Sequence, residues 1–179
     1  MTNTEPSLYG DVARGFVQQA REFLNDQYLP KIERCLEKLT DEQIWWRSNP
    51  ESNSIGNLLL HICGNARQWI VCGLGGERDR RERQTEFARR EASRDELVSL
   101  LQKTVSEVDE TLSGFDETRL LEKYRIQGTE VTALNAIFHV TEHFSMHTGQ
   151  IILLTKMLAN VDLVFYDFSS GKPVHTWER

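Results

Sequence analysis

Residues 139–156 read HVTEHFSMHTGQIILLTK, and this stretch decides most of the fold. Histidines stand at positions 139, 143 and 147 within it. Steps of four residues place side chains on one face of an α-helix, which turns once in about 3.6 residues. The apolar residues that follow keep the same spacing, so the stretch predicts part of a long helix that Thr132 caps.

Helical periodicity continues outward from this segment over nearly the whole chain. Ser54 and Ser93 are suited to cap two earlier helices, and Pro30 either kinks the first helix or starts a second segment there. A short extended piece is indicated before Gly128. The long helices are predicted at about residues 9–39, 54–74, 93–114 and 133–158.

The fold class follows from length, composition and these helices. A chain of 179 residues with 39% hydrophobic and 27% charged residues is typical of a globular protein that buries one core. We expect a single domain spanning residues 1–179. Four long helices in one domain predict an all-α fold, a four-helix bundle.

The net charge and the composition of individual segments limit the classes of partner that the protein can have. A net charge of −6 argues against nucleic acid as a partner. No apolar run is long enough to cross a membrane, and residues 1–11 lack the features of a secretory signal. We therefore predict a cytoplasmic protein whose three cysteines are reduced. We also predict that it uses a small-molecule substrate and pairs as a homodimer.

Two other segments carry their own predictions. Residues 77–91, ERDRRERQTEFARRE, are so densely charged that a solvated loop or exposed helix is expected. The tail, residues 162–179, is aromatic, and we expect it to pack back over the helices or against a second subunit.

The histidines indicate a metal site. Imidazoles one helical turn apart can chelate one ion, but His139 and His147 lie about 12 Å apart along the axis and cannot share it. A catalytic site of the zinc type takes three protein ligands, and His61, in the middle of the second predicted helix, is a candidate for the third. The alternatives are a hydrogen-bonded ladder or an exposed stripe for the stack, and an ordinary core residue for His61.

Two motifs resemble a known family. The segments SIGNLLLHICGNARQW (residues 54–69) and HVTEHFSMHTGQIILLTK are similar to the paired signatures of the DinB-like (YfiT-like) superfamily. In that family a histidine midway along the second helix is followed by H-x-x-x-H and a Gly-Gln-Ile-type run on the last helix. The resemblance implies a four-helix bundle of DinB/YfiT-like type that binds a divalent metal through His61, His143 and His147. His139 is then either a packing or hydrogen-bonding neighbour of these ligands or a ligand itself.

Three further residues are candidates for the surroundings of the site. Gln150 either hydrogen-bonds a metal-bound water or closes the helix packing. Glu142 either accepts a hydrogen bond from an imidazole N–H or is a surface carboxylate. Asn65 either lines the same cavity or caps a backbone group.

Three neutral imidazoles leave the charge of a bound ion uncompensated, so the ion lowers the pKa of a bound thiol or water. The resemblance implies either activation of a small thiol, as in an S-transferase or isomerase, or metal-dependent hydrolysis. A metal-stabilised binding or stress-associated protein without turnover is the third alternative. Zinc or nickel suits the ligands best, with iron or copper as alternatives, and a low-molecular-weight thiol is the expected cosubstrate.

Overall fold

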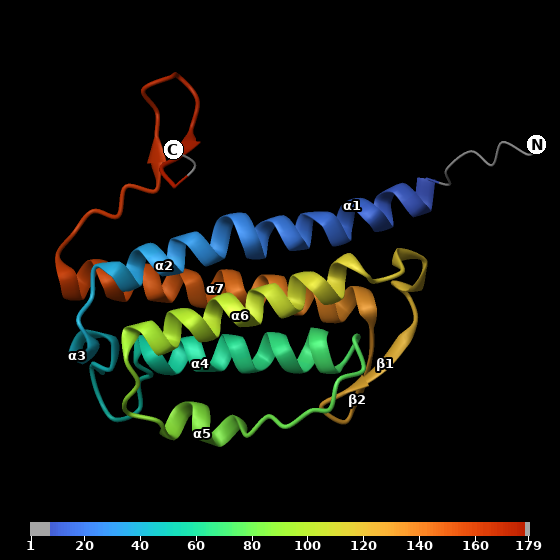
Figure 1. Ribbon diagram of the computed structural model, residues 1–179, viewed down its shortest axis with the longest axis horizontal. Helices are drawn as coiled ribbons and strands as arrows, with labels where there is room; N and C mark the ends of the chain where they lie inside the picture. The colour runs from blue at the N-terminus through green and yellow to red at the C-terminus, as the bar shows by residue number, and fades with distance from the viewer. Residues whose placement is uncertain (1–7, 178–179) are drawn as a thin grey trace, which may run out of the picture.

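The computed structural model describes residues 8–177, which are mostly helical (Figure 1). The first helical segment comprises α1 (Leu8–Glu22), the π-helical turn η1 (Phe23–Tyr28) and α2 (Leu29–Glu37), without a break. Pro30 therefore lies within one long helix. The Leu29 N–H donates to Leu24 O, five residues back, so wider π turns precede the proline that cannot donate.

The second segment is built on a reciprocal cap. After α3 (Asp41–Ile44), Ser54 begins α4 (Ile55–Ala66), which continues as the π-helical η2 (Arg67–Cys72). The Ser54 hydroxyl accepts from the Asn57 N–H, and the Asn57 side chain accepts from the Ser54 N–H. The predicted helix over 54–74 is confirmed.

The remaining long helices also begin at their predicted caps. Ser93 caps α6 (Arg94–Ser113), and Thr132 accepts a hydrogen bond from the N–H of Asn135 at the start of α7 (Ala133–Ala159). α7 ends where Asn160 adopts a left-handed conformation, φ 51°.

A hairpin leads into α7. The short helix η3 (Glu117–Arg119) precedes β1 (Lys123–Ile126) and β2 (Thr129–Thr132), which pair in antiparallel register with Ile126 opposite Thr129. Gln127 and Gly128 both have positive φ, 51° and 77°, as a two-residue hairpin turn requires. The predicted extended piece is therefore one strand of a hairpin.

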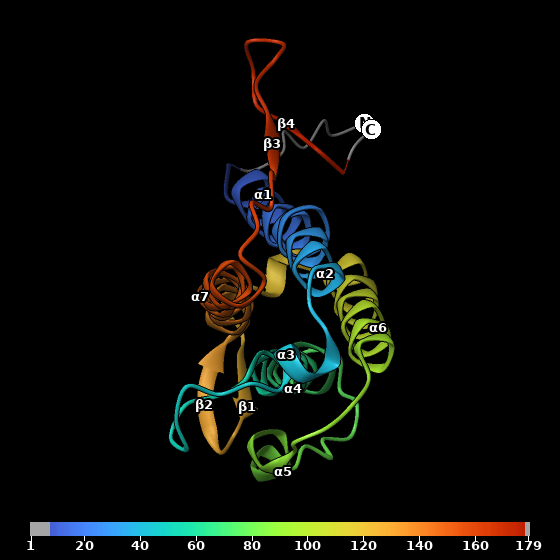
Figure 2. The same cartoon turned by 90° about the vertical axis from the view of Figure 1, so that its left-hand side faces the viewer.

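The four long segments enclose the core, as the end-on view shows (Figure 2). α4 packs against α6 and α7, and α2 packs against the same two helices. Apolar side chains at helical spacing fill the space between them. Among those almost fully buried are Ile32, Leu36, Leu59, Ile62, Leu101, Ile137 and Phe144.

The charged segment contains α5 (Arg83–Ala88), which lies against α4 (Figure 2). Most of residues 77–91 are exposed, as predicted. The prediction is wrong for Arg81 and Glu86, whose side chains are only 5% and 10% exposed.

The tail forms a second hairpin, β3 (Tyr166–Asp167) with β4 (Val174–His175), that stands away from the helices (Figure 2). Arg34 of α2 donates to Val164 O at 2.9 Å and anchors its base. The base of the tail therefore packs back over the helices, one of the two expected alternatives, because Leu163 is buried in the core and Phe165 packs against it. Within residues 8–177, no helix has the length and hydropathy needed to span a membrane.

Candidate metal centre

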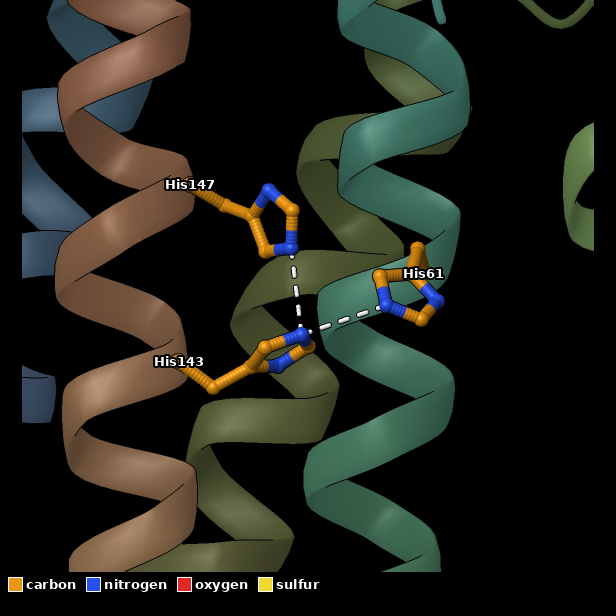
Figure 3. A group of neighbouring side chains, drawn as sticks. All are labelled: His61, His143 and His147. Carbon is orange, nitrogen blue, oxygen red and sulfur yellow. Dashed lines mark hydrogen bonds between the residues drawn. The ribbon is translucent and has the colours of Figure 1, made fainter.

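Three histidines meet between α4 and α7, with their Nε2 atoms turned toward one another (Figure 3). His143 Nε2 lies 3.2 Å from His61 Nε2 and 3.1 Å from His147 Nε2. The three potential ligand atoms all lie within 4.8 Å of one another, and all three residues are buried. The structure thus brings together the three residues expected from the sequence.

His139 is set apart from this group. Its Nε2 lies 3.3 Å from Asn65 Nδ2 and its Nδ1 lies 3.3 Å from Glu142 Oε1. Its ring lies against those of Trp69 and His143, with centroids 4.3 and 5.3 Å away. His139 therefore lies outside the three-histidine group and packs beside it, with the carboxylate of Glu142 within ion-pair distance of its ring.

On His61 and His147, contacts of the Nδ1 atom, which points away from the centre of the cluster, indicate which ring nitrogen carries the hydrogen. His61 Nδ1 lies 3.1 Å from Glu86 Oε2, and His147 Nδ1 lies 2.7 Å from Gln150 Oε1. A carboxylate and an amide oxygen only accept, so these contacts favour a hydrogen on both Nδ1 atoms and Nε2 lone pairs that face the centre. Arg81 Nη2, which only donates, also lies 3.2 Å from His61 Nδ1, but it has a shorter bond, 2.8 Å, to Glu86 Oε2. Gln150 orients His147 by its bond to Nδ1, a role different from both alternatives derived from the sequence.

This donor set fits a divalent metal ion. When the hydrogen of His61 and of His147 is on Nδ1, the Nε2 atoms of both rings carry lone pairs, and only the Nε2 atom of His143 can carry a hydrogen. Without a cation, at least two lone pairs therefore face each other at the centre. The Nδ1 atom of His143 is buried and has no hydrogen-bond partner. Bonds of about 2.0–2.1 Å to zinc place tetrahedral ligand nitrogens roughly 3.3 Å apart, close to the two observed separations.

A buried ion pair stands behind His61. Arg81 donates through Nε to Glu86 Oε1 at 2.6 Å and through Nη2 to Oε2 at 2.8 Å. Burial acts to raise the pKa of Glu86, but the hydrogen bonds from Arg81 and His61 outweigh it and hold that pKa below its usual value. Glu86 is therefore a carboxylate that orients His61.

Backbone anchors bring Glu86 to this position. The Nδ2 group of Asn57, buried in the capping box of α4, donates to Glu86 O at 2.7 Å and Arg89 O at 3.0 Å. Arg47 Nη2 donates to Phe87 O at 3.1 Å, and the Phe87 ring packs against His61 with centroids 4.9 Å apart. Residues 77–92 are called the strap from here on.

Gly64 makes room for the carboxylate. A Cβ atom at this position of α4 would lie 2.1 Å from Glu86 Oε1 and 3.0 Å from Arg81 Nε. A glycine in the middle of a helix weakens the helix, so its presence here is explained by the space that the ion pair needs.

Comparisons with known proteins identify the family of the chain and structures with a similar fold. A family model described as "protein of unknown function (DUF1572)" matches residues 11–172. The chain belongs to the DUF1572 family. No curated protein matches this DUF1572 chain in sequence.

Two solved structures, one of them a DinB-like protein, share the fold of the DUF1572 chain. A conserved protein from Enterococcus faecalis is similar with TM-score 0.68 and 18% identity, over 80% of this chain and 97% of that chain. A DinB-like protein from Bacillus cereus is similar with TM-score 0.64 and 20% identity, over 84% of this chain and 94% of that chain.

Burial in the cluster also lowers the pKa values of two of its histidines. Burial, reinforced by the neighbouring His147 and His61, lowers the pKa of His143 from 6.5 to about 3. Burial lowers the pKa of His147 as well, although the bond to Gln150 partly opposes this. Both rings are therefore neutral at physiological pH, the form that binds metals.

The first prediction concerns Gly64→Ala, with Gly15→Ala as its matched control, because a Cβ at Gly15 meets nothing within 4 Å. In Gly15→Ala the free energy of unfolding should rise by about 0.5–1 kcal/mol, the usual gain in a helix. In Gly64→Ala the displaced Glu86 should leave His61 unoriented and weaken zinc binding about 10–100-fold. Competition with a chromogenic chelator measures this, and wild-type affinity in Gly64→Ala would contradict the role assigned to Glu86.

The second prediction concerns the metal-free protein. Unfolded histidines titrate near 6.5, whereas folded His143 stays neutral down to about pH 3. As pH falls through this window, the unfolded chain binds protons that the folded protein does not, so the free energy of unfolding decreases. Urea unfolding at steps between about pH 7 and 4 should show this decrease, and His143→Phe should flatten it. An equal slope in the variant would count against the assignment.

Proposed function

We propose that this DUF1572 protein binds one divalent transition metal ion through the Nε2 atoms of His61, His143 and His147. The observation that carries the proposal is the convergence of these atoms while two of the Nδ1 atoms are held by acceptors. We also propose that the four long helical segments are the four-helix bundle of the DinB-like type. Zinc or nickel is the expected ion, with iron or copper as alternatives.

We further propose that the site activates a small thiol, as an S-transferase or isomerase does. A divalent ion held by three neutral imidazoles lowers the pKa of a thiol or water bound to it. Hydrolysis by water gains from a free general base beside the metal. The carboxylate and the amide that touch the ligand rings are both engaged, Glu86 with Arg81 and Gln150 with His147. This favours a thiol, because binding to the metal is enough to deprotonate the thiol and so produces the nucleophile without a general base.

The homodimer is also a proposal, and the exposed side of α7 supports it. Apolar side chains recur along that side, with Phe138, Leu153 and Met157 each 59–66% exposed. Burying such a row against a second copy is favourable. The cytoplasmic location and the single domain stay predictions from the sequence.

The third prediction tests the metal. Protein purified without a chelating tag should contain about one equivalent of a transition metal by elemental analysis. His61→Ala, His143→Ala and His147→Ala should each lose it, because two imidazoles hold the ion far less tightly than three. His139→Ala and His175→Ala are the controls and should keep it. Full occupancy in His143→Ala would refute the site, as would no uptake by the wild type after reconstitution with zinc, nickel and iron.

The fourth prediction tests the thiol. In the cobalt-substituted protein, a small thiol such as 2-mercaptoethanol should produce a thiolate-to-cobalt charge-transfer absorption band, because a metal-bound thiol is deprotonated. The band should be absent in His143→Ala. Turnover of an ester or amide without any thiol band would favour the hydrolase instead. Neither signal, with the metal bound, would favour the metal-stabilised binding protein.

A further inference from the structure

Each proposed ligand requires a hydrogen-bond acceptor on its far side. A neutral imidazole that coordinates through Nε2 carries its hydrogen on Nδ1. Glu86 accepts from His61 and Gln150 accepts from His147. The Nδ1 atom of His143 is buried and lacks a partner, so coordination by His143 would leave a buried N–H without an acceptor.

An unpartnered acceptor lies on the facing helix. Asn65, one turn beyond His61 on α4, is 5% exposed, and its Oδ1 is buried without a partner. Its Nδ2 lies 3.3 Å from Nε2 of His139, whose ring stacks on that of His143 at 5.3 Å with an angle of 25° between the planes. The two unpartnered atoms therefore belong to side chains that both contact the same ring.

The orientation of the Asn65 amide follows from its neighbours. Glu142 Oε1 lies 3.3 Å from His139 Nδ1, and this carboxylate favours a hydrogen on that nitrogen, so His139 Nε2 can accept from the amide nitrogen of Asn65, which lies 3.3 Å from it. The oxygen is then the atom left over, and an oxygen is what the N–H of His143 needs.

Other unpartnered buried atoms in residues 8–177 are poorer candidates. Arg47 Nε and Trp69 Nε1 only donate. Thr148 follows His143 by five residues, which places it about 140° around the axis of α7. Tyr124 lies on the hairpin strand β1 and not on the helix that faces His143.

We infer that Asn65 is the positioning residue of His143: its Oδ1 accepts the Nδ1–H of His143 when His143 Nε2 binds the metal. This inference rests on the proposed metal site and extends it to the third ligand. The three hydrogen-bond acceptors behind the ligands are then the carboxylate of Glu86 and the carboxamides of Gln150 and Asn65. Only one of the three ligand rings is therefore hydrogen-bonded to a negatively charged group. A neutral acceptor behind His143 keeps the ion a strong Lewis acid, as thiol activation requires.

The test compares zinc affinity in wild type, Asn65→Leu, Asn65→Asp and His139→Phe by chelator competition. Asn65→Leu should bind zinc at least about tenfold more weakly, whereas Asn65→Asp, which keeps an acceptor, should restore the affinity. His139→Phe should bind as wild type. If His139→Phe is weakened as much as Asn65→Leu, the effect passes through His139 and the inference is overturned.

A second readout reports the hydrogen bond itself. In ¹⁵N-histidine-labelled, zinc-loaded protein, the Nδ1–H proton of His143 should move upfield or exchange faster in Asn65→Leu, while those of His61 and His147 stay in place. If Asn65→Leu does not fold, Asn65→Asp decides alone: a charged acceptor should move the His143 proton downfield, and an unmoved signal overturns the inference.

The outcomes separate the two proposals. Wild type that binds no zinc refutes the metal site, and the inference falls with it. Wild type that binds zinc, alongside Asn65→Leu with equal affinity and an unchanged His143 signal, refutes the role of Asn65 alone.

Discussion

Three basic nitrogens meet at a buried point between α4 and α7, and their mutual approach is unfavourable unless a cation or a shared proton lies between them. The two Nε2 separations around His143 are 3.2 and 3.1 Å, distances at which lone pairs repel. Burial opposes the simplest relief, protonation, and lowers the pKa of His143 to about 3. A divalent ion would satisfy all three rings, so the packing that buries the histidines is also the packing that the proposed metal needs.

The surroundings of the cluster show how the fold maintains this arrangement. Asn57 is fully buried and serves both as a partner in the cap of α4 and as the anchor of the strap, through Glu86 O and Arg89 O. The start of the helix that carries His61 and the placement of the carboxylate behind His61 thus depend on one side chain. Gly64, three residues after His61, provides the space. Changes in the strap should therefore reach the metal through His61 rather than through any direct contact.

The sequence predicts His143 and His147 as a pair because their spacing is local, whereas His61, 82 residues from His143, was expected from its place in the second helix and from the family resemblance. His143 and His147 share a helix face through periodicity alone, and the caps at Ser54, Ser93 and Thr132 determine where the helices begin. The role of Pro30 stayed open, because periodicity does not show whether a π turn will absorb a proline.

The partners behind the ligands were harder to predict. Glu86 lies 25 residues from His61, in a run whose composition indicates solvent exposure. Only the folded strap shows that Arg81 neutralises this carboxylate and allows its burial. Gln150 is local, three residues after His147, yet its role depends on which ring nitrogen faces the centre, and spacing does not fix that. Gly64, within α4, was a sequence feature that could have indicated a close contact there.

The charges behind the ligands connect this geometry to reactivity. An anionic acceptor makes an imidazole a stronger donor and lessens the Lewis acidity of the ion, whereas a carboxamide does so less. In this protein Glu86 is also bonded to Arg81, which withdraws part of its charge from His61. His147 is held by the neutral Gln150. An ion in the proposed site would therefore keep most of its positive charge for a fourth ligand, and this electrostatic balance is an argument for the proposed thiolate over a passive structural role.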